Sequence, residues 1–385
     1  MGKRLILLVL IAAPLAVWLP RLLAPGREDR PTAQLRLAAG DDAAGFSRAI
    51  EARPFELPLD HGPHHEYQTE WWYYTGNLST EAGRHFGYQL TIFRRGLAPA
   101  PPPPPPGLST NQFYFAHLAL TDTWAGRHTQ AERLSRGALG LAGADAAPYR
   151  VWVEDWGVTA VTPDGSGVRL QAREGDWHIS LDLQATKPLV AHGHRGLSAK
   201  SQQAGNASYY VGYTRMATSG TVATPQGEWP VAGESWFDHE WSTSALGPGA
   251  VGWDWFSLQL SDGRELMLFH IRRGDGSVDL ASGGTLVQED GATRRLRVSD
   301  VDLGVLDTWR SPETGARYPS RWLLAIPSER VEIEIVPRLP DQEMRTSFVY
   351  WEGAVQLQGS KAGEPLTGHG YVELTGYARS MQGVF

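Results

Sequence analysis

Short runs in which apolar and polar residues alternate recur along most of the chain after Phe55, and no long amphipathic helical repeat interrupts them. Alternation with a period of two is typical of strands, because successive side chains point to opposite faces. Many short strands at close spacing favour a β sandwich or barrel. The plainest strands are expected at 149–156, 168–172, 177–185 and 209–216. The pattern therefore predicts an all-β protein.

A hairpin that opens on tryptophan occurs twice. Trp72 begins the first copy and Trp255 the second, and each copy continues through a Gly-Arg pair into a strand that ends in two arginines. The echo predicts two similar β units, although unrelated hairpins use similar turn residues and can therefore have similar sequences by chance. Gly247-Pro-Gly249 marks a loop between them, which places the boundary within 242–251. Two domains also suit a chain of 385 residues.

Composition narrows the function classes. The chain has 43 glycines, 26 prolines and 15 tryptophans, which fits many short strands, and it has no cysteine. Disulfides, thiolate nucleophiles and cysteine metal ligands are therefore excluded. A net charge of -7 without a basic stripe excludes nucleic acid as an expected partner. The run Pro101 to Pro106 must adopt polyproline II and predicts an exposed loop between strands.

The N-terminus carries an export pattern. Lys3 and Arg4 precede an apolar run over 5–19, and Arg21 and the small residue Ala24 follow it. Residues 1–24 are therefore expected to be a signal peptide, or an uncleaved membrane anchor, and residues 25–50 a leader into the folded part. This places the protein in the periplasm or cell envelope.

The densest chemistry lies in Glu234-Ser-Trp-Phe-Asp-His-Glu-Trp241. On a strand, one face would carry Ser235, Phe237, His239 and Trp241, and the other Glu234, Trp236, Asp238 and Glu240. One of these faces is expected to line a cavity, where an apolar wall raises the pKa of a carboxyl group. The alternative is an aromatic-rich core strand whose charges reach solvent.

Other familiar sites are missing. Gly233-Glu-Ser-Trp-Phe237 lacks the second glycine of a nucleophile elbow, and no phosphate-binding or dinucleotide-binding glycine loop occurs. The pairs His64-His65 and His192-Gly-His194 have no further ligand at suitable spacing. We therefore predict neither a metal nor another cofactor.

The remaining candidate site is a group of aromatic residues on the expected strands, with a few acidic residues among them. They predict a cavity for a long apolar ligand, in which a few acids orient the ligand or deliver a proton. The expected lining comprises Glu70, Trp71, Trp72, Tyr74, Tyr209, Tyr210, Arg215, Trp236, Asp238, His239 and Trp241.

Four segments carry a family resemblance: Thr69-Glu-Trp-Trp-Tyr-Tyr-Thr-Gly-Asn77, Trp236-Phe-Asp-His-Glu-Trp241, Tyr350-Trp-Glu-Gly-Ala354 and Gly370-Tyr-Val-Glu-Leu-Thr-Gly376. They resemble the carotenoid 1,2-hydratase (hydroxyneurosporene synthase) and AttH family over nearly all the chain after residue 50. The resemblance implies two consecutive lipocalin-like (calycin-type) antiparallel β barrels, over 51–243 and 244–385. Members include hydratases, pericyclases and exported predicted hydrolases, often encoded beside ABC transporter components, so fold transfers better than activity.

The resemblance also implies roles for residues. The hydratase acid region corresponds to Asp238, His239 and Trp241, and adding water to an isolated double bond needs a protonated carboxyl group in an apolar pocket. Asp238 or Glu70 would be the acid, and His239 would orient it or the water. Trp71, Trp236 and Trp241 would stabilise the cation, and the ligand site would be completed by Trp72, Tyr74, Tyr210 and Arg215. The competing hypothesis is a non-catalytic carrier of a lipid or isoprenoid that serves an envelope ABC transporter.

Overall fold

The computed structural model describes residues 43–99, 107–243 and 246–383. The expected signal peptide, most of the expected leader and the proline run lie outside these ranges, so they stay predictions. Within the described ranges, no helix is long and apolar enough to cross a membrane. All the described residues belong to one compact unit, residues 36–385.

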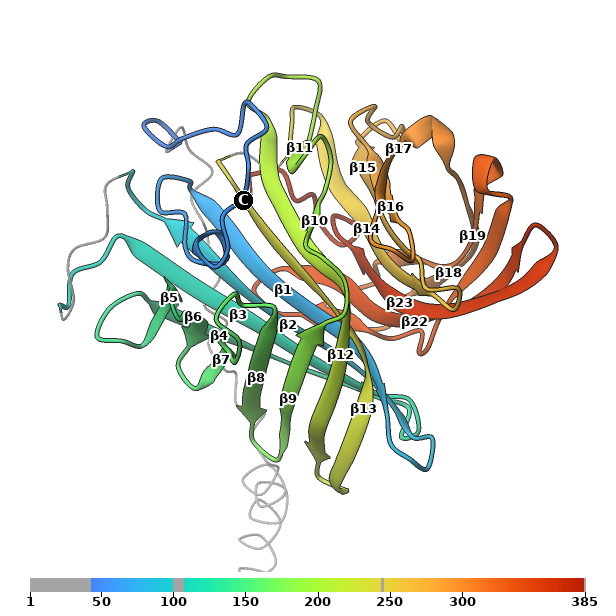
Figure 1. Cartoon of the computed structure of the whole chain (residues 1–385), viewed down its shortest axis with the longest axis horizontal. Helices are drawn as coiled ribbons and strands as arrows, with labels where there is room; N and C mark the ends of the chain where they lie inside the picture. The colour runs from blue at the N-terminus through green and yellow to red at the C-terminus, as the bar shows by residue number, and fades with distance from the viewer. Residues whose placement is uncertain (1–42, 100–106, 244–245, 384–385) are drawn as a thin grey trace, which may run out of the picture. The chain divides into compact units, whose positions relative to one another are not determined.

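The first sheet contains thirteen antiparallel strands and follows the short 3-10 helix η1, Leu59–His61 (Figure 1). Its main path runs in the order β4-β3-β2-β1-β13-β12-β9-β8-β7-β6-β5, with β10 and β11 paired to β12. The strands are β1 Thr69–Ser79, β2 His85–Gly96, β3 Gln112–Asp122, β4 Arg127–Arg136, β5 Ala142–Ala146, β6 Tyr149–Val153, β7 Trp156–Ala160, β8 Gly167–Glu174, β9 Trp177–Ala185, β10 Val190–Ala191, β11 Leu197–Ala199, β12 Ala207–Thr224 and β13 Gly227–Ser242.

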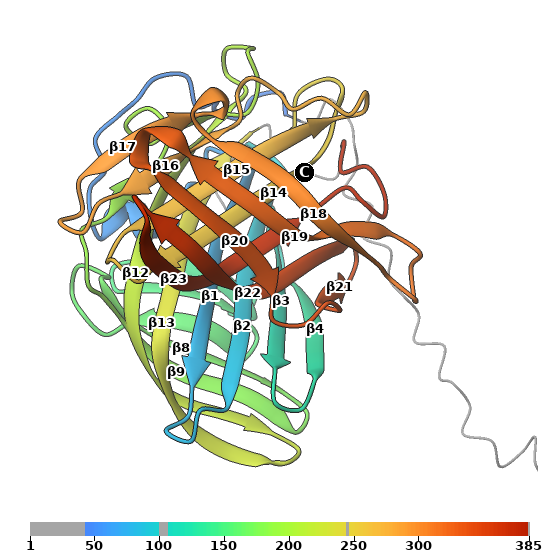
Figure 2. The same ribbon diagram turned by 90° about the vertical axis from the view of Figure 1, so that its right-hand side faces the viewer.

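The second sheet contains ten antiparallel strands in the order β17-β16-β15-β14-β23-β22-β20-β19-β18, with β21 paired to β22. Figure 2 shows β20, β19 and β18 side by side in this order. The elements are β14 Ala250–Leu260, β15 Glu265–Arg273, β16 Gly283–Val287, β17 Thr293–Arg297, η2 Val298–Asp300, β18 Asp302–Arg310, β19 Arg317–Ile326, η3 Pro327–Glu329, β20 Val331–Pro337, β21 Glu343–Arg345, β22 Val349–Lys361 and β23 Glu364–Leu374.

Each sheet curls back on itself, so that one edge strand contacts residues near the other end. In the first sheet, Arg133 of β4 lies over the Trp156 ring of β7 at 4.4 Å and donates to the carbonyl of Arg173 in β8. In the second sheet, Arg294 of β17 pairs with Glu329 of η3 at 2.8 Å. The prediction of an all-β fold with two lipocalin-like barrels is confirmed.

The two echoed hairpins occupy equivalent places in the two sheets. β1 pairs with β2 and with β13, which is the last strand of the first sheet in chain order. β14 pairs in the same way with β15 and with β23, the last strand of the second sheet in chain order. Their turns make the same backbone hydrogen bonds, Thr80 to Arg84 and Leu260 to Arg264. Gly83 and Gly263 both have positive φ, near 80°, a conformation that glycine adopts without steric cost. The sequence echo therefore reflects one repeated structural unit.

Each barrel has its own hydrophobic core, and a third cluster joins the two sheets. The third cluster combines Tyr73, Tyr210 and Trp236 of the first sheet with Trp255, Met267, Phe269, Ile271 and Tyr371 of the second, among others. At Gly87 an added Cβ would lie 2.6 Å from the Ala354 Cβ, so β2 and β22 approach too closely there for a side chain. The candidate site lies in this inter-sheet region.

Candidate functional site

Strand β13 separates two buried environments, because its alternate side chains point to opposite sides. Phe237 packs into the core of the first barrel, whereas Trp236 belongs to the inter-sheet cluster. The predicted division of the segment into two faces is therefore what the structure shows. It also places Asp238 and His239, which we expected to act together, on opposite sides of the strand.

The inter-sheet side contains a cavity of about 90 Å³, enough for several water molecules or part of a flat apolar ligand. Aromatic and aliphatic side chains from both sheets form most of its wall, and three carboxyl groups and one lysine are set among them. Its lining comprises Trp71, Tyr73, Thr91, Phe93, Lys200, Tyr210, Asp238, Glu240, Leu246, Trp253, Trp255, Phe269, Ile271 and Glu373.

Asp238 is the most unusual acid of this cavity. It is 2% exposed, and burial raises the pKa of its carboxyl group to about 8. Tyr210 Oη donates to Asp238 Oδ2 at 2.5 Å and itself accepts from Trp255 Nε1 at 2.9 Å. The other oxygen, Oδ1, has no hydrogen-bond partner among the described residues and lies 3.7 Å from His192 Nε2. Near neutral pH Asp238 is therefore mainly a carboxylic acid that can give up a proton.

Glu240 is buried as part of an ion pair in the same cavity. It accepts from the Ser208 hydroxyl and pairs with the Lys200 ammonium group. Lys200 Nζ also lies 5.4 Å from the ring centre of Tyr210 and 5.2 Å from that of Phe269. The cavity thus has a charged end beside its aromatic walls.

Two further acids, Glu352 and Glu373, were not among the residues that we predicted for the site. They face each other across β22 and β23. Tyr73 Oη donates to Glu352 Oε1 at 2.7 Å, and Trp253 Nε1 donates to Glu373 Oε1. Burial raises the pKa of Glu352 well above its usual value and that of Glu373 to about 7. Both lie in the tail motifs that carried the family resemblance, but their shared position depends on strand pairing.

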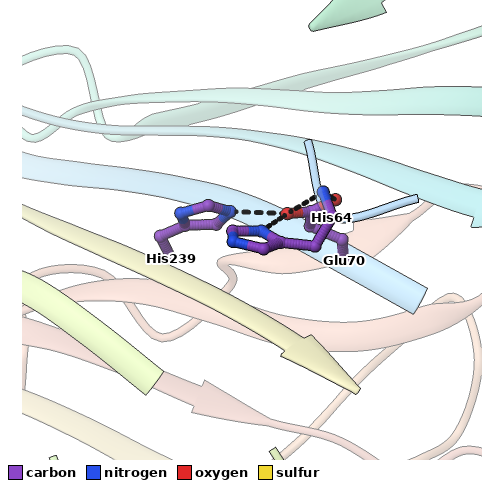
Figure 3. Close-up of side chains that lie close together, drawn as sticks. All are labelled: His64, Glu70 and His239. Carbon is purple, nitrogen blue, oxygen red and sulfur yellow. Dashed lines mark hydrogen bonds and ion pairs between the residues drawn. The ribbon is translucent and has the colours of Figure 1, made fainter. Parts of the chain in front are cut away.

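Glu70 belongs to a different buried cluster, on the first-barrel side of β13 (Figure 3). Glu70 Oε1 lies 2.7 Å from His64 Nδ1 and 2.9 Å from His239 Nε2, and Arg94 Nε donates to Oε2 at 2.7 Å. Burial alone would raise the pKa of Glu70, but Arg94 and His64 hold it well below its usual value. Glu70 is therefore a carboxylate near neutral pH, and the structure does not support it as an alternative proton donor.

Aromatic rings enclose this cluster. Trp241 stacks on His64 with ring centres 3.8 Å apart, and Trp72 stacks on His239 at 4.9 Å. Trp72 Nε1 donates to the carbonyl of His61 at 2.9 Å. These contacts fix the segment before β1 onto the barrel, which is a structural role for His239 and Trp241.

The nitrogens and oxygens of His64, Glu70 and His239 lie close enough together to hold a metal ion. Both Glu70 oxygens are already engaged, and the second ring nitrogen of His64, Nε2, lies 3.0 Å from its partner Asp60 Oδ1. The adjacent Arg94 guanidinium adds a positive charge that opposes a cation. The donor set therefore fits a self-satisfied charge network better than a metal centre.

The predicted ligand-binding residues are also divided. Trp71 and Tyr210 line the cavity, and Trp236 lies in the surrounding inter-sheet cluster. Tyr74 lies inside the first barrel, where its hydroxyl is 2.9 Å from that of Tyr149, and Trp72 belongs to the same core. Arg215 lies outside the cavity lining and pairs with both Glu265 and Glu234 at 2.6 Å. It links the two sheets rather than contacting a ligand.

Known proteins share this architecture. A putative AttH from Nitrosomonas europaea is 33% identical, with a TM-score of 0.77 over 87% of this chain and 100% of that one. The structure of kievitone hydratase from Nectria haematococca is 17% identical and has a TM-score of 0.64 over 87% and 97% of the two chains, a likeness of fold.

Sequence comparison agrees. Kievitone hydratase from Fusarium solani subsp. phaseoli is 24% identical over 246 residues, which are 61% of this chain and 68% of that protein. Residues 48–377 match the sequence description of the AttH-like family, and this match covers most of the chain. The protein therefore belongs to the AttH-like family.

Proposed function

We propose that this protein is a cofactor-free hydratase that adds water to an isolated carbon–carbon double bond of an apolar ligand, such as an isoprenoid or lipid, by acid catalysis. The observation that carries the proposal is a protonated carboxyl group, Asp238, in the wall of an aromatic cavity. The similarity to kievitone hydratase, which is a hydratase by name, supports the reaction class.

The chemistry follows from the lining. Proton transfer from Asp238 to one carbon of the double bond creates a cation on the other carbon, and a water oxygen then bonds to that carbon. The faces of Trp71, Trp253 and Trp255 stabilise positive charge in the cavity by their π systems, by about 0.5–2 kcal/mol each. Burial of the acid is what keeps its proton available near neutral pH.

A non-catalytic carrier for a lipid or isoprenoid, working with an envelope ABC transporter, is the second proposal. The observation that favours it is the mainly apolar wall of the cavity, which suits ligand burial without chemistry. Location in the periplasm or cell envelope is part of this proposal and rests on the sequence pattern over 1–24.

Incubation with geraniol and squalene in ¹⁸O-labelled water separates the two. The hydratase proposal expects labelled alcohol from the wild type and a decrease of roughly two to four decades in Asp238→Asn, which keeps the shape but loses the transferable proton. Asp182→Asn, at an exposed position on β9, serves as the control and should match the wild type. Absence of labelled alcohol with every substrate, together with saturable quenching of tryptophan fluorescence, would support the carrier instead.

A further inference from the structure

Strand pairing sets acids of both sheets beside residues whose side chains form hydrogen bonds between the sheets. In the first sheet, Tyr73 is the cross-strand neighbour of Asp238, and its hydroxyl donates to Glu352 of the second sheet. In the second sheet, Trp255 is the cross-strand neighbour of Glu373, and its indole N–H donates to Tyr210, which donates to Asp238. Asp238 and Glu373 therefore lie in the wall of one cavity although they are distant in sequence.

The strand pairing gives Glu352 and Glu373 unusual properties. Directly opposite side chains in an antiparallel pair lie close together, and two like charges there are destabilising. Each acid has one oxygen held by a donor from a neighbouring strand, Tyr73 for Glu352 and Trp253 for Glu373. The second oxygen of Glu352 makes no hydrogen bond of normal geometry to the described residues. The pair therefore favours a state with one proton and one negative charge, in which either member can exchange a proton.

The two members differ in access to a ligand. Glu373 lines the cavity, whereas Glu352 is fully buried and does not. Burial raises the pKa of both groups, but that of Glu373 only to about 7, so Glu373 is the member that is partly ionised near neutral pH. Of the two acids, Glu373 is the one positioned to receive a proton from a molecule in the cavity.

Resting on the proposed function, we propose that Glu373, paired with Glu352, is a second catalytic residue that accepts a proton from the water that adds to the double bond. Asp238 gives its proton to one alkene carbon, and the π electron pair forms the new C–H bond. The water oxygen bonds to the cationic carbon while one water proton passes to Glu373. The proton then returns from Glu373 to Asp238 through water in the cavity, so that alkene and water are consumed and one alcohol is formed.

The test separates proton donation from water addition by using geraniol and squalene in D₂O. If Asp238 protonates the alkene, reversal of that step leaves deuterium in recovered alkene or in a positional isomer, even when water addition fails. In Glu373→Gln, alcohol formation should fall by roughly two to four decades while deuterium still enters the recovered alkene. In Asp238→Asn, both the alcohol and the deuterium exchange should be lost.

Two further variants control for structural effects. Glu352→Gln keeps the carboxyl group of Glu373, so its alcohol formation should fall less than that of Glu373→Gln. Glu334→Gln, on the surface of β20, should match the wild type. Circular dichroism and thermal melting of each variant verify folding, and a misfolded Glu373→Gln is replaced by Glu373→Asp, which should recover part of the alcohol formation.

The outcomes are distinct. If Glu373→Gln forms alcohol at the wild-type rate while Asp238→Asn is inactive, the role of Glu373 is overturned and the proposed function stands. Equal loss of alcohol in Glu352→Gln and Glu373→Gln, or loss of exchange in folded Glu373→Gln, also overturns it. Neither alcohol nor exchange in the wild type overturns the proposed function itself, and the role of Glu373 with it.

Discussion

The two sides of β13 bury similar acids in opposite electrostatic states. On the barrel side, Glu70 is surrounded by Arg94, His64 and His239, and its pKa lies well below the usual value. On the cavity side, Asp238 has no cation in hydrogen-bond contact, and its pKa rises to about 8. Burial is common to both, so the difference comes from the compensating charges.

The charges around each buried acid therefore distinguish a structural role from a chemical one. A buried charge with a partner of opposite charge is typical of a structural role. A buried acid without such a partner destabilises the fold, and groups of this kind are typical of functional sites. The barrel-side cluster holds the segment before β1, and the cavity side presents a proton.

The largest expected loss of stability comes from removing the positive charge that compensates Glu70 on the barrel side. Arg94→Met leaves the carboxylate of Glu70 buried without its guanidinium partner, since both side chains are fully buried. Breaking a buried ion pair in this way should lower the free energy of unfolding by about 3–5 kcal/mol. Denaturant titration measures this value. A loss below about 1 kcal/mol, the size typical of an exposed pair, would contradict the structural role of the cluster.

An effect that is smaller per pH unit, and opposite in sign on the two sides, is expected in the pH dependence of stability. The folded-state pKa of Asp238 is raised, so the unfolded chain ionises first and the contribution of Asp238 to stability falls as pH rises from about 4 to about 8. Asp238→Asn removes this loss, and its stability relative to wild type should rise by up to about 1.4 kcal/mol per pH unit in that window.

Glu70 provides the matched comparison. Because its folded-state pKa is lowered, its contribution is present above the unfolded pKa, about 4.3, and is lost as pH falls below it. The penalty of Glu70→Gln should therefore shrink in acid, as pH falls below about 4.3. Parallel pH profiles for the two variants would show that the two sides of β13 do not differ as described.

Much of the fold could be predicted from local pattern. Alternating residues identified the strands, and the Trp72 and Trp255 echo identified hairpins that occupy equivalent places in the two sheets. Period-two alternation also separated the two faces of the Glu234 to Trp241 segment. These features depend on residues close together in the chain, where sequence is informative.

The composition of the site could not be predicted in the same way. Glu70 and Asp238 both occur in aromatic strand motifs, and only the tertiary contacts with Arg94 and His64 distinguish them. Glu352 and Glu373 meet through the pairing of β22 with β23, which alternation does not specify. Arg215 seemed suited to a ligand, but acids on β13 and β15 bind it instead.

Infrared difference spectroscopy shows directly whether Asp238 holds a proton at neutral pH. The spectrum of wild type minus Asp238→Asn at pH 7 should contain the C=O stretch of a protonated carboxyl group, and this band should disappear as pH is raised through about 8. Isotopic labelling of aspartate with ¹³C should shift the band. A carboxylate signal for Asp238 throughout pH 5 to 7 would show that Asp238 is ionised in the folded protein and cannot donate the proton.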